Sequence, residues 1–591
     1  MFFVNKNKLD LDERYFQYVY KDDSVEWYID GTLYYLIHPK DKKLVTCFDS
    51  KTLNRVFKSC DYNPYDIKQL LEGHYIFIIK KDDKILLFGD YFNRKNLFYV
   101  TIDDLFLFDT VLSKNLINNC NGNLNNMFLM SYMKIGYSHA SETLYEDIHR
   151  LSFQQYIEIK DGKMGLHYNF TPNLIHDYDT SMLRKFEKLF IESVKSRVDE
   201  SGSTWLMASS GWDSTIILDT LVKILNKKKI HTATFEVLFR NGDCLNSFEV
   251  EKIKDISRHY DVDNHSYIVD LDDKKLVDMW KKYAHTCFEN HVFQWPINQL
   301  GVINHIKKSD PYVKSIFNGE AADSMQNFGF SQYGSIHIGD NDFDEYADKM
   351  KTYLYGGTFY KKFLDGSFKD DKIYNIFKSI NKGIRFYDNE PYSNVMMSFI
   401  YSPSRLPFTI PSGFYDEIFD RHFKKYYDIL NPYNIYSIWN ALYADYHFKG
   451  STIPLNIVGI ESVGCKPALP FFDLRLSRFF NEMPESWGRG LNWNRLKYPE
   501  KTMAFRSRTF PLDIVERKIP HSYIYEKDDK IDDKYEYYVN SSIGDYFKDI
   551  FEDGDFIWLK KISCFIDSKI NSLDFVIRLG TLQSIMMEGL K

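Results

Sequence analysis

Hydrophobic residues in the first part of the chain fall into short runs that predict β-strands. The runs at 75–79 and 85–88 flank the polar segment 80–84, an arrangement typical of a β-hairpin. Further runs of the same kind follow between residues 96 and 108. Strands that are apolar on both faces need cover on both sides, so we expect sheets inside a layered α/β domain.

Beyond residue 180 the apolar positions take the spacing of helices that alternate with short strands. Residues 182–198 show one apolar helical face. A strand at 204–207, a turn of small residues, a helix over 214–225 and a strand at 230–235 follow. This order predicts a parallel βαβ unit, because the helix returns the chain to the same sheet.

The second half of the chain is expected to be mostly helical. A further buried strand is predicted at 313–317, and the pattern of segment 340–450 indicates mainly helices. The charge run 527–534 leads into a helical end of the chain. At roughly 150 residues per domain, the length allows several units. We predict three, at residues 1–170, 180–530 and 531–591.

The composition is that of an ordinary globular protein, with 44% hydrophobic and 27% charged residues. The net charge of −7 gives no electrostatic footprint for nucleic acid. No segment approaches the ~18 apolar residues of a membrane span, and the N-terminus lacks the apolar centre of a signal peptide. The seven cysteines form no C-x-x-C pair. We expect a cytoplasmic protein with no nucleic-acid or membrane partner.

The segment Ser-Ser-Gly-Trp-Asp-Ser lies where a predicted parallel strand gives way to a helix. Such a turn presents unpaired N–H groups and a helix N-terminus, which favour anions. Gly211 allows close approach of phosphate, and the hydroxyls of Ser209, Ser210 and Ser214 add donors. Asp213 would repel phosphate unless a divalent cation lies between them, so it predicts Mg²⁺. The alternative is a structural turn in which Asp213 caps the helix.

Several segments together resemble the asparagine synthetase family of the class B type. The segment at 209–214 is similar to the family's S-G-G-x-D-S pyrophosphate loop, with Ser210 in place of the first glycine. The sequences Asn-Gly-Glu-Ala-Ala-Asp at 318–323 and Pro-Phe-Phe-Asp at 470–473 resemble its S-G-E-G-S-D and P-F-L-D motifs. The amidotransferase domain of the family is matched by segments at 71–77 and 90–99.

This resemblance implies a fold and a reaction. The expected fold is an N-terminal Ntn-hydrolase-like αββα sandwich followed by a parallel α/β domain of the PP-loop ATP-pyrophosphatase type. In such a family ATP adenylates a substrate carboxylate with release of pyrophosphate, and an amine then displaces AMP to form an amide. The expected cofactors are ATP and Mg²⁺.

The resemblance also assigns roles to the carboxylates. Asp213 and Asp323 match the family's Mg²⁺ ligands, which neutralise charge on the departing pyrophosphate. Glu320 matches the residue that accepts a proton from the attacking amine. The alternative for Glu320 and Asp323 is a pair of solvated carboxylates at the end of a strand.

Further residues are expected around the nucleotide. Gly319 and Lys501 join the loop at 209–214 as candidates for binding ATP and pyrophosphate. Lys518 resembles the family's catalytic lysine only with a one-residue gap, because Ile519 stands at the aligned position. The alternative is that Lys518 is an ordinary surface lysine.

Two departures from the family change the functional prediction. Glutamine-hydrolysing members have a cysteine nucleophile where this chain has Phe2, and a phenyl ring cannot replace a thiolate. The family's glutamine-holding elements are also missing from the first hundred residues. Lys466 stands where the family usually has Glu, and we expected it to hold a substrate carboxylate or phosphate.

These observations predict an AMP-forming amide ligase that does not hydrolyse glutamine. The favoured subtype is a lasso-peptide-type macrolactam synthetase, and Glu320 disfavours β-lactam synthetases, which have Tyr there. The alternatives are an enzyme that amidates a sugar or natural-product carboxylate with ammonia or a separate amine, and a non-catalytic scaffold. The expected partners are small-molecule or peptide carboxylates and amines, with a homodimer or a pathway protein as further possibilities.

Overall fold

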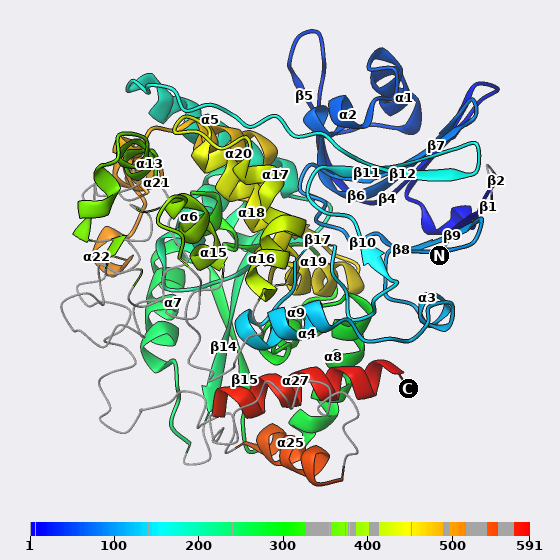
Figure 1. Ribbon diagram of the computed structural model, residues 1–591. Helices are drawn as coiled ribbons and strands as arrows, with labels where there is room; N and C mark the ends of the chain where they lie inside the picture. Colours follow the sequence, from blue (N-terminus) through cyan, green and yellow to red (C-terminus); the bar gives the residue numbers. More distant parts are fainter. Residues whose placement is uncertain are drawn as a thin grey trace.

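The computed structural model of the chain contains two antiparallel sheets, one parallel sheet and a large helical part (Figure 1). It describes residues 2–5, 8–139, 141–238, 242–326, 354, 356–372, 374–375, 378, 386–400, 413–450, 452–487, 497–515, 541–553 and 573–590. The charge run predicted at 527–534 lies outside these residues, as do parts of the segment at 340–450.

The antiparallel sheets come from the N-terminal part of the chain. One has the order β10 (His149–Arg150), β8 (Phe98–Ile102), β9 (Leu105–Asp109), β1 (Phe2–Asn5) and β2 (Lys8–Leu11). The other has the order β12 (Lys163–Tyr168), β11 (Gln155–Lys160), β7 (Lys84–Gly89), β6 (Leu71–Lys81), β4 (Val25–Ile37) and β3 (Tyr18–Lys21), with β5 (Leu44–Val45) beside β4. The predicted hairpin is β6–β7, in which Lys81 pairs with Lys84.

Alternation along β6 shows how the layers are stacked. Phe77 and Ile79 pack in a core with residues of α1 (Ser50–Ser59) and α2 (Pro64–Leu70). Ile76 and Ile78 point to the opposite face and pack against strands of the first sheet. The far face of that sheet packs on α3 (Lys114–Asn118) and α4 (Asn126–Ile135). These four layers form the predicted αββα sandwich, here called the N-terminal sandwich.

The third sheet has five strands, all parallel to their neighbours. Their order is β15 (Asp263–Asp270), β14 (Ile230–Leu238), β13 (Ser203–Met207), β16 (Val313–Asn318) and β17 (Lys466–Ala468). The helices associated with it are α5 (Ser181–Arg197), α6 (Trp212–Ile224), α7 (Ser247–Tyr260), α8 (Lys275–Glu289) and α9 (Ile297–Ser309). The predicted βαβ unit is β13–α6–β14, so this part of the fold is confirmed.

Helices follow β16 and surround the sheet. The main ones are α13 (Gly357–Leu364), α15 (Pro391–Ile400), α18 (Ile435–Gly450), α19 (Thr452–Ser462), α20 (Leu474–Glu482), α21 (Tyr498–Arg506), α25 (Ser542–Asp553) and α27 (Leu573–Leu590). The C-terminal α27 lies along α8, where the indole of Trp280 donates to the hydroxyl of Ser584 at 2.9 Å. Among the described residues, no helix is both long and apolar enough to cross a membrane.

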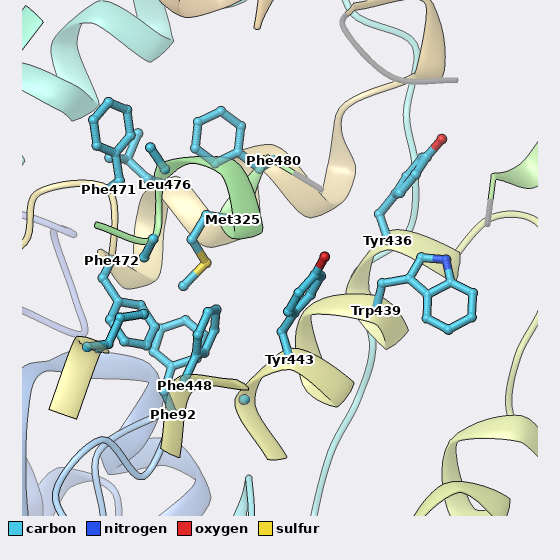
Figure 2. Packing of buried hydrophobic residues seen from close by; sticks show 14 of the residues in the cluster. Phe92, Met325, Tyr436, Trp439, Tyr443, Phe448, Phe471, Phe472, Leu476 and Phe480 are labelled. Atoms are coloured by element: carbon cyan, nitrogen blue, oxygen red, sulfur yellow. The ribbon is translucent and has the colours of Figure 1, made fainter. Parts of the chain in front are cut away.

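An aromatic cluster joins the N-terminal sandwich to the helical part (Figure 2). Phe92 comes from the loop after β7, Phe448 from α18 and Phe472 from the loop before α20. The ring of Phe472 lies 4.6 Å from the ring of Phe92 and 4.6 Å from that of Phe448, centroid to centroid. All three are buried, so the contact removes a large apolar area from water and holds the two parts together.

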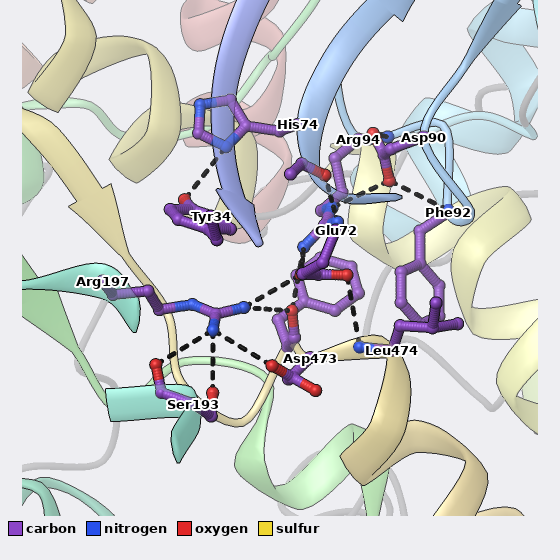
Figure 3. A network of polar contacts seen from close by, with 12 residues as sticks. Tyr34, Glu72, His74, Asp90, Phe92, Arg94, Ser193, Arg197, Asp473 and Leu474 are labelled. Atoms are coloured by element: carbon purple, nitrogen blue, oxygen red, sulfur yellow. Dashed lines mark hydrogen bonds and ion pairs between the residues drawn. The ribbon is translucent and has the colours of Figure 1, made fainter. Parts of the chain in front are cut away.

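A buried ion network crosses the same boundary (Figure 3). Arg197, at the end of α5, contacts Glu72 of β6 at 2.9 Å and Asp473 at 3.1 Å. Arg94, after β7, contacts the same Glu72 oxygen at 2.9 Å and Asp90 at 2.8 Å. Since these side chains are almost fully removed from water, each arginine depends on carboxylates from other segments for its charge to be tolerated.

Asp473 shows that the P-F-F-D segment is structural. Its carboxylate also accepts N–H bonds from Arg475 and Leu476 and so begins α20. Burial opposes ionisation of this carboxyl, but Arg475 and Arg197 lower its pKa to about 2. The segment that resembles P-F-L-D therefore anchors the boundary with the N-terminal sandwich.

We predict that Asp473→Asn lowers the free energy of unfolding by about 3–5 kcal/mol, because it leaves Arg197 buried with one carboxylate fewer. Asn caps a helix about as well as Asp, so the substitution separates the lost charge from the lost cap. Urea denaturation of both proteins measures the difference. Asp61→Asn is the matched control, since Asp61 is 88% exposed where it pairs with Lys81, and it should change little.

The same carboxylate predicts a pH dependence. With an unfolded pKa of about 3.9 and a folded pKa of about 2, Asp473 stabilises the protein fully above about pH 5. Its contribution is lost as the pH falls toward 2. In Asp473→Asn the free energy of unfolding should therefore change less over this interval, and an unchanged acid limb would contradict the assignment.

Candidate active site

The two motif segments begin side by side at the carboxyl ends of neighbouring strands. β13 leads into residues 209–214, and β16 ends at the start of 318–323. Met207 pairs with Asn318, so both segments leave the sheet at the same level. The chain runs outward from β13 to β14 and β15 and then crosses back to β16. The crevice at this reversal of strand order is where open parallel sheets bind ligands.

The first segment forms a tight turn ahead of α6. The hydroxyls of Ser209 and Ser214 lie 2.9 Å apart, and the Ser214 hydroxyl also donates to the Ser209 carbonyl at 2.8 Å. Gly211 precedes the first residue of α6, and no side chain caps this helix end. Backbone N–H groups at an uncapped N-terminus suit an anion, which agrees with the predicted pyrophosphate loop.

Ser210 differs from its neighbours in the turn. Its side chain is buried, and its N–H donates to a carboxylate oxygen of Glu249 on α7 at 3.4 Å. Ser209 is exposed and Gly211 partly so. The turn therefore presents Ser209 and Gly211 to a ligand more openly than Ser210, the residue that replaces the family's first glycine.

The second segment packs directly on the first. A Cβ on Gly319 would lie 3.3 Å from the backbone nitrogen of Ser214 and 3.4 Å from Cβ of Asp213, so a larger residue would push the two segments apart. Ala321 has φ of 69°, where the matched family motif has glycine. This left-handed conformation costs an L-residue roughly 1–2 kcal/mol, so the site contains local backbone strain.

A lysine that the sequence analysis missed joins the two expected metal ligands. The Nζ atom of Lys497 lies 2.6 Å from Oδ1 of Asp213 and 2.5 Å from Oδ1 of Asp323. Burial opposes its charge, but the two carboxylates raise the pKa of Lys497, so it is an ammonium. Its only signal in the sequence was its position four residues before Lys501, which does not distinguish it from a surface lysine.

A fourth residue, Glu500, lies behind this group. It is fully buried on α21, and the amide of Gln326 donates to its Oε2 at 2.8 Å. Burial and the neighbouring Asp213 raise the pKa of Glu500 well above its ordinary value. Its environment therefore favours the protonated form of this carboxyl group over the ionised form.

Glu320 lies near the two aspartates, whose charges add to burial in raising its pKa. The hydroxyl of Thr452, at the start of α19, donates to its Oε1 at 2.7 Å. Burial raises the pKa of Glu320, while the bond from Thr452 acts in the opposite direction. A carboxylate with a raised pKa is better matched to accepting a proton near neutral pH than an exposed one.

The basic residues expected from the sequence have different outcomes. The Nζ atom of Lys501 lies 5.8 Å from the ring centroid of Trp212, the first residue of α6. It is therefore near the turn at 209–211. Lys518 lies outside the described residues. Lys466 is not at the site, which corrects our expectation of a substrate-binding cation. Its Nζ donates to the carbonyl of Ser196 at 2.8 Å and lies over the ring of Tyr34, at the boundary with the N-terminal sandwich.

The donor set at the crevice fits Mg²⁺. Within the described ranges, no group of three or more His, Cys, Asp or Glu side chains could hold a metal ion. Mg²⁺ in nucleotide enzymes is usually bound by one or two carboxylates together with substrate phosphates and water. Asp213 and Asp323, which already share one cation, match that requirement.

Comparison with known proteins assigns a family to this region. The profile of the asparagine synthase family matches residues 185–377, about a third of the chain, and this stretch includes both motif segments. No curated protein sequence matches the chain. Among solved structures, glutamine phosphoribosylpyrophosphate amidotransferase from B. subtilis, complexed with ADP and GMP, matches at 9% identity and a TM-score of 0.17. That match covers 42% of this chain and 62% of the other, and so low a TM-score supports no conclusion. Residues 185–377 of this chain therefore form a region that matches the asparagine synthase family, a family of ATP-dependent carbon–nitrogen ligases.

Proposed function

We propose that this protein adenylates a substrate carboxylate with ATP and couples it to an amine, with release of pyrophosphate and AMP. The observation that carries the proposal is the meeting of Asp213, Asp323 and Glu320 at one crevice, beside the uncapped N-terminus of α6. Two neighbouring carboxylates can bind a metal ion, and the helix N-terminus beside them can bind the phosphates that the metal ion accompanies. A turn with a purely structural role would not require a pair of acidic residues there.

Each group has a distinct task in this reaction. The turn at 209–211 and the N-terminus of α6 bind phosphate oxygens, with Lys501 nearby. Asp213 and Asp323 would hold Mg²⁺, which when bound neutralises charge on the departing pyrophosphate. Glu320 takes the proton that the amine loses as it attacks the acyl group of the adenylate.

The amine is proposed to come from a source other than glutamine. Support comes from Phe2, which lies in β1 and pairs with Leu11 and Phe108 on the two sides of the strand. A phenylalanine supplies no nucleophile for glutamine hydrolysis. An amine within the substrate itself, as in a lasso-peptide-type macrolactam synthetase, is the favoured case. Free ammonia or a separate amine acting on a sugar or natural-product carboxylate is the alternative.

A non-catalytic scaffold is the second candidate function. Ser210 replaces a glycine of the family's loop, and its N–H is bonded to the Glu249 carboxylate. An acidic acceptor at this position competes with phosphate for the turn. ATP binding distinguishes the two candidates, because a scaffold that has lost the phosphate site would not bind Mg²⁺–ATP at millimolar concentration.

The first prediction from the proposed function concerns the source of the amine nitrogen. We expect no release of glutamate from glutamine in the presence of ATP, Mg²⁺ and acceptor, because Phe2 offers no thiolate. Glutamate can be measured by a coupled dehydrogenase assay, with ammonium chloride in place of glutamine as the matched reaction. Glutamate formation well above the level without enzyme would contradict glutamine independence.

The second prediction concerns the metal ligands. Asp213→Asn and Asp323→Asn should each slow ATP–pyrophosphate exchange by about 10²-fold or more, since each removes a ligand of the ion that stabilises the leaving group. Asp255→Asn, an exposed carboxylate on α7, is the control for loss of one negative charge. Exchange at nearly the normal rate in Asp213→Asn would show that the metal site is elsewhere.

The third prediction separates the two half-reactions. Glu320→Gln keeps the acceptor for Thr452 but removes the base, so amide formation should fall by about 10²–10⁴-fold while ATP–pyrophosphate exchange is retained. Equal loss of both half-reactions would assign Glu320 to the nucleotide or the metal.

Thr452→Val is the matched variant for this test. Since the bond from Thr452 lowers the pKa of Glu320, its removal should move the acid limb of the pH profile for amide formation to higher pH. Amide formation at high pH should remain close to that of the unmodified protein. A profile that does not move would show that Glu320 is not the titrating base.

A further inference from the structure

Lys497 occupies a position that a simple surface lysine would not take. Its ammonium contacts one oxygen of Asp213 and one of Asp323, and only 11% of its side chain is exposed. Its backbone is in the left-handed region, with φ of 52°, and α21 begins at the next residue. The side chain is thus directed to the carboxylate pair from a fixed point at the start of a helix.

The contacts of Lys497 place a positive charge between the carboxylates of Asp213 and Asp323. Asp213 and Asp323 come from different segments and would repel each other if no cation lay between them. The two contacts set one ammonium against two carboxylate groups, so Lys497 offsets only part of the negative charge that the ionised pair carries. A divalent cation would be held by the same two carboxylates, so it competes with the ammonium for their negative charge.

A phosphate group bound at the turn 209–211 would give the ammonium a second negatively charged group to contact. Gly319 lies against Asp213 and Ser214, so the carboxylate pair directly adjoins the N-terminus of α6. A polyphosphate bound there would bring several negative charges beside Lys497. With Mg²⁺ between the carboxylates and Lys497 still present, the same groups would carry about +1 and would attract this anion.

We propose that Lys497 is the resident counter-cation of the Asp213–Asp323 pair in the nucleotide-free protein, and that it transfers to the polyphosphate when a divalent cation binds between the carboxylates. This inference rests on the proposed function, since it takes the crevice to be the site of Mg²⁺ and ATP. It assigns to Lys497 a role in binding pyrophosphate, in addition to Lys501.

The test measures metal binding without nucleotide. Lys497→Met removes the ammonium and keeps a long side chain, so Mn²⁺ alone should bind at least tenfold more tightly than to the unmodified protein, as measured by electron paramagnetic resonance. Mg²⁺–ATP should bind at least tenfold more weakly, because the cation for the phosphates is lost. A lysine with a purely structural role would not produce opposite changes in the two affinities.

Three variants serve as controls. Lys497→Arg keeps the charge and should leave Mn²⁺ binding as weak as in the unmodified protein. Lys501→Met removes a neighbouring lysine inside α21 and should leave the affinity for Mn²⁺ alone within twofold. Lys497→Met combined with Asp323→Asn should abolish the tighter binding, which places the metal at this pair.

A measurement on the unmodified protein covers the case in which Lys497→Met does not fold. Inorganic pyrophosphate should tighten Mn²⁺ binding at least tenfold, because the ammonium then has an anion to contact. Absence of this synergy, or Mn²⁺ affinity that is unchanged or weaker in folded Lys497→Met, would overturn the proposal. If ATP does not bind but Mn²⁺ responds as expected, the proposed function fails while the role of Lys497 as counter-cation stands.

Discussion

The parallel pairing of β13 with β16 is the constraint on which the site depends. It places Met207 opposite Asn318, so segments more than a hundred residues apart in sequence leave the sheet together. This register brings the N-terminus of α6, the carboxylate pair and Glu320 to the same end of the sheet. A shift of one residue in the pairing would turn each side chain to the opposite face and separate the groups.

Much of the fold could be predicted because the hydrophobic period changes clearly along the chain. The apolar runs at 75–79 and 85–88 around a polar segment indicated the β6–β7 hairpin, and the strand–turn–helix order at 204–225 indicated the parallel unit. Asp213 was found from its place in a turn at a strand end, and Glu320 and Asp323 from the resemblance of 318–323 to a family motif. Local sequence carries such features, since the same few residues both form the turn and supply the chemistry.

The residues that were missed or misplaced depend on contacts between distant segments. Lys497 reaches Asp213 across 284 positions of sequence, and its neighbours Tyr498 and Pro499 do not indicate this. Lys466 was assigned to substrate because of the residue that it replaces, yet its ammonium is bonded to the Ser196 carbonyl. Asp473 belongs to a family motif but serves a buried ion network. In each case the partner is fixed by tertiary packing, which sequence spacing does not record.

The buried network of Figure 3 also bears on how the parallel sheet depends on the N-terminal sandwich. Arg197 ends the helix that leads into β13, and one of its two carboxylate partners, Glu72, belongs to the N-terminal sandwich. Removal of the sandwich would take Glu72 away and leave Arg197 with Asp473 as the one carboxylate of this network that it contacts. The sandwich therefore supplies part of the charge balance around the helix that leads into the parallel sheet.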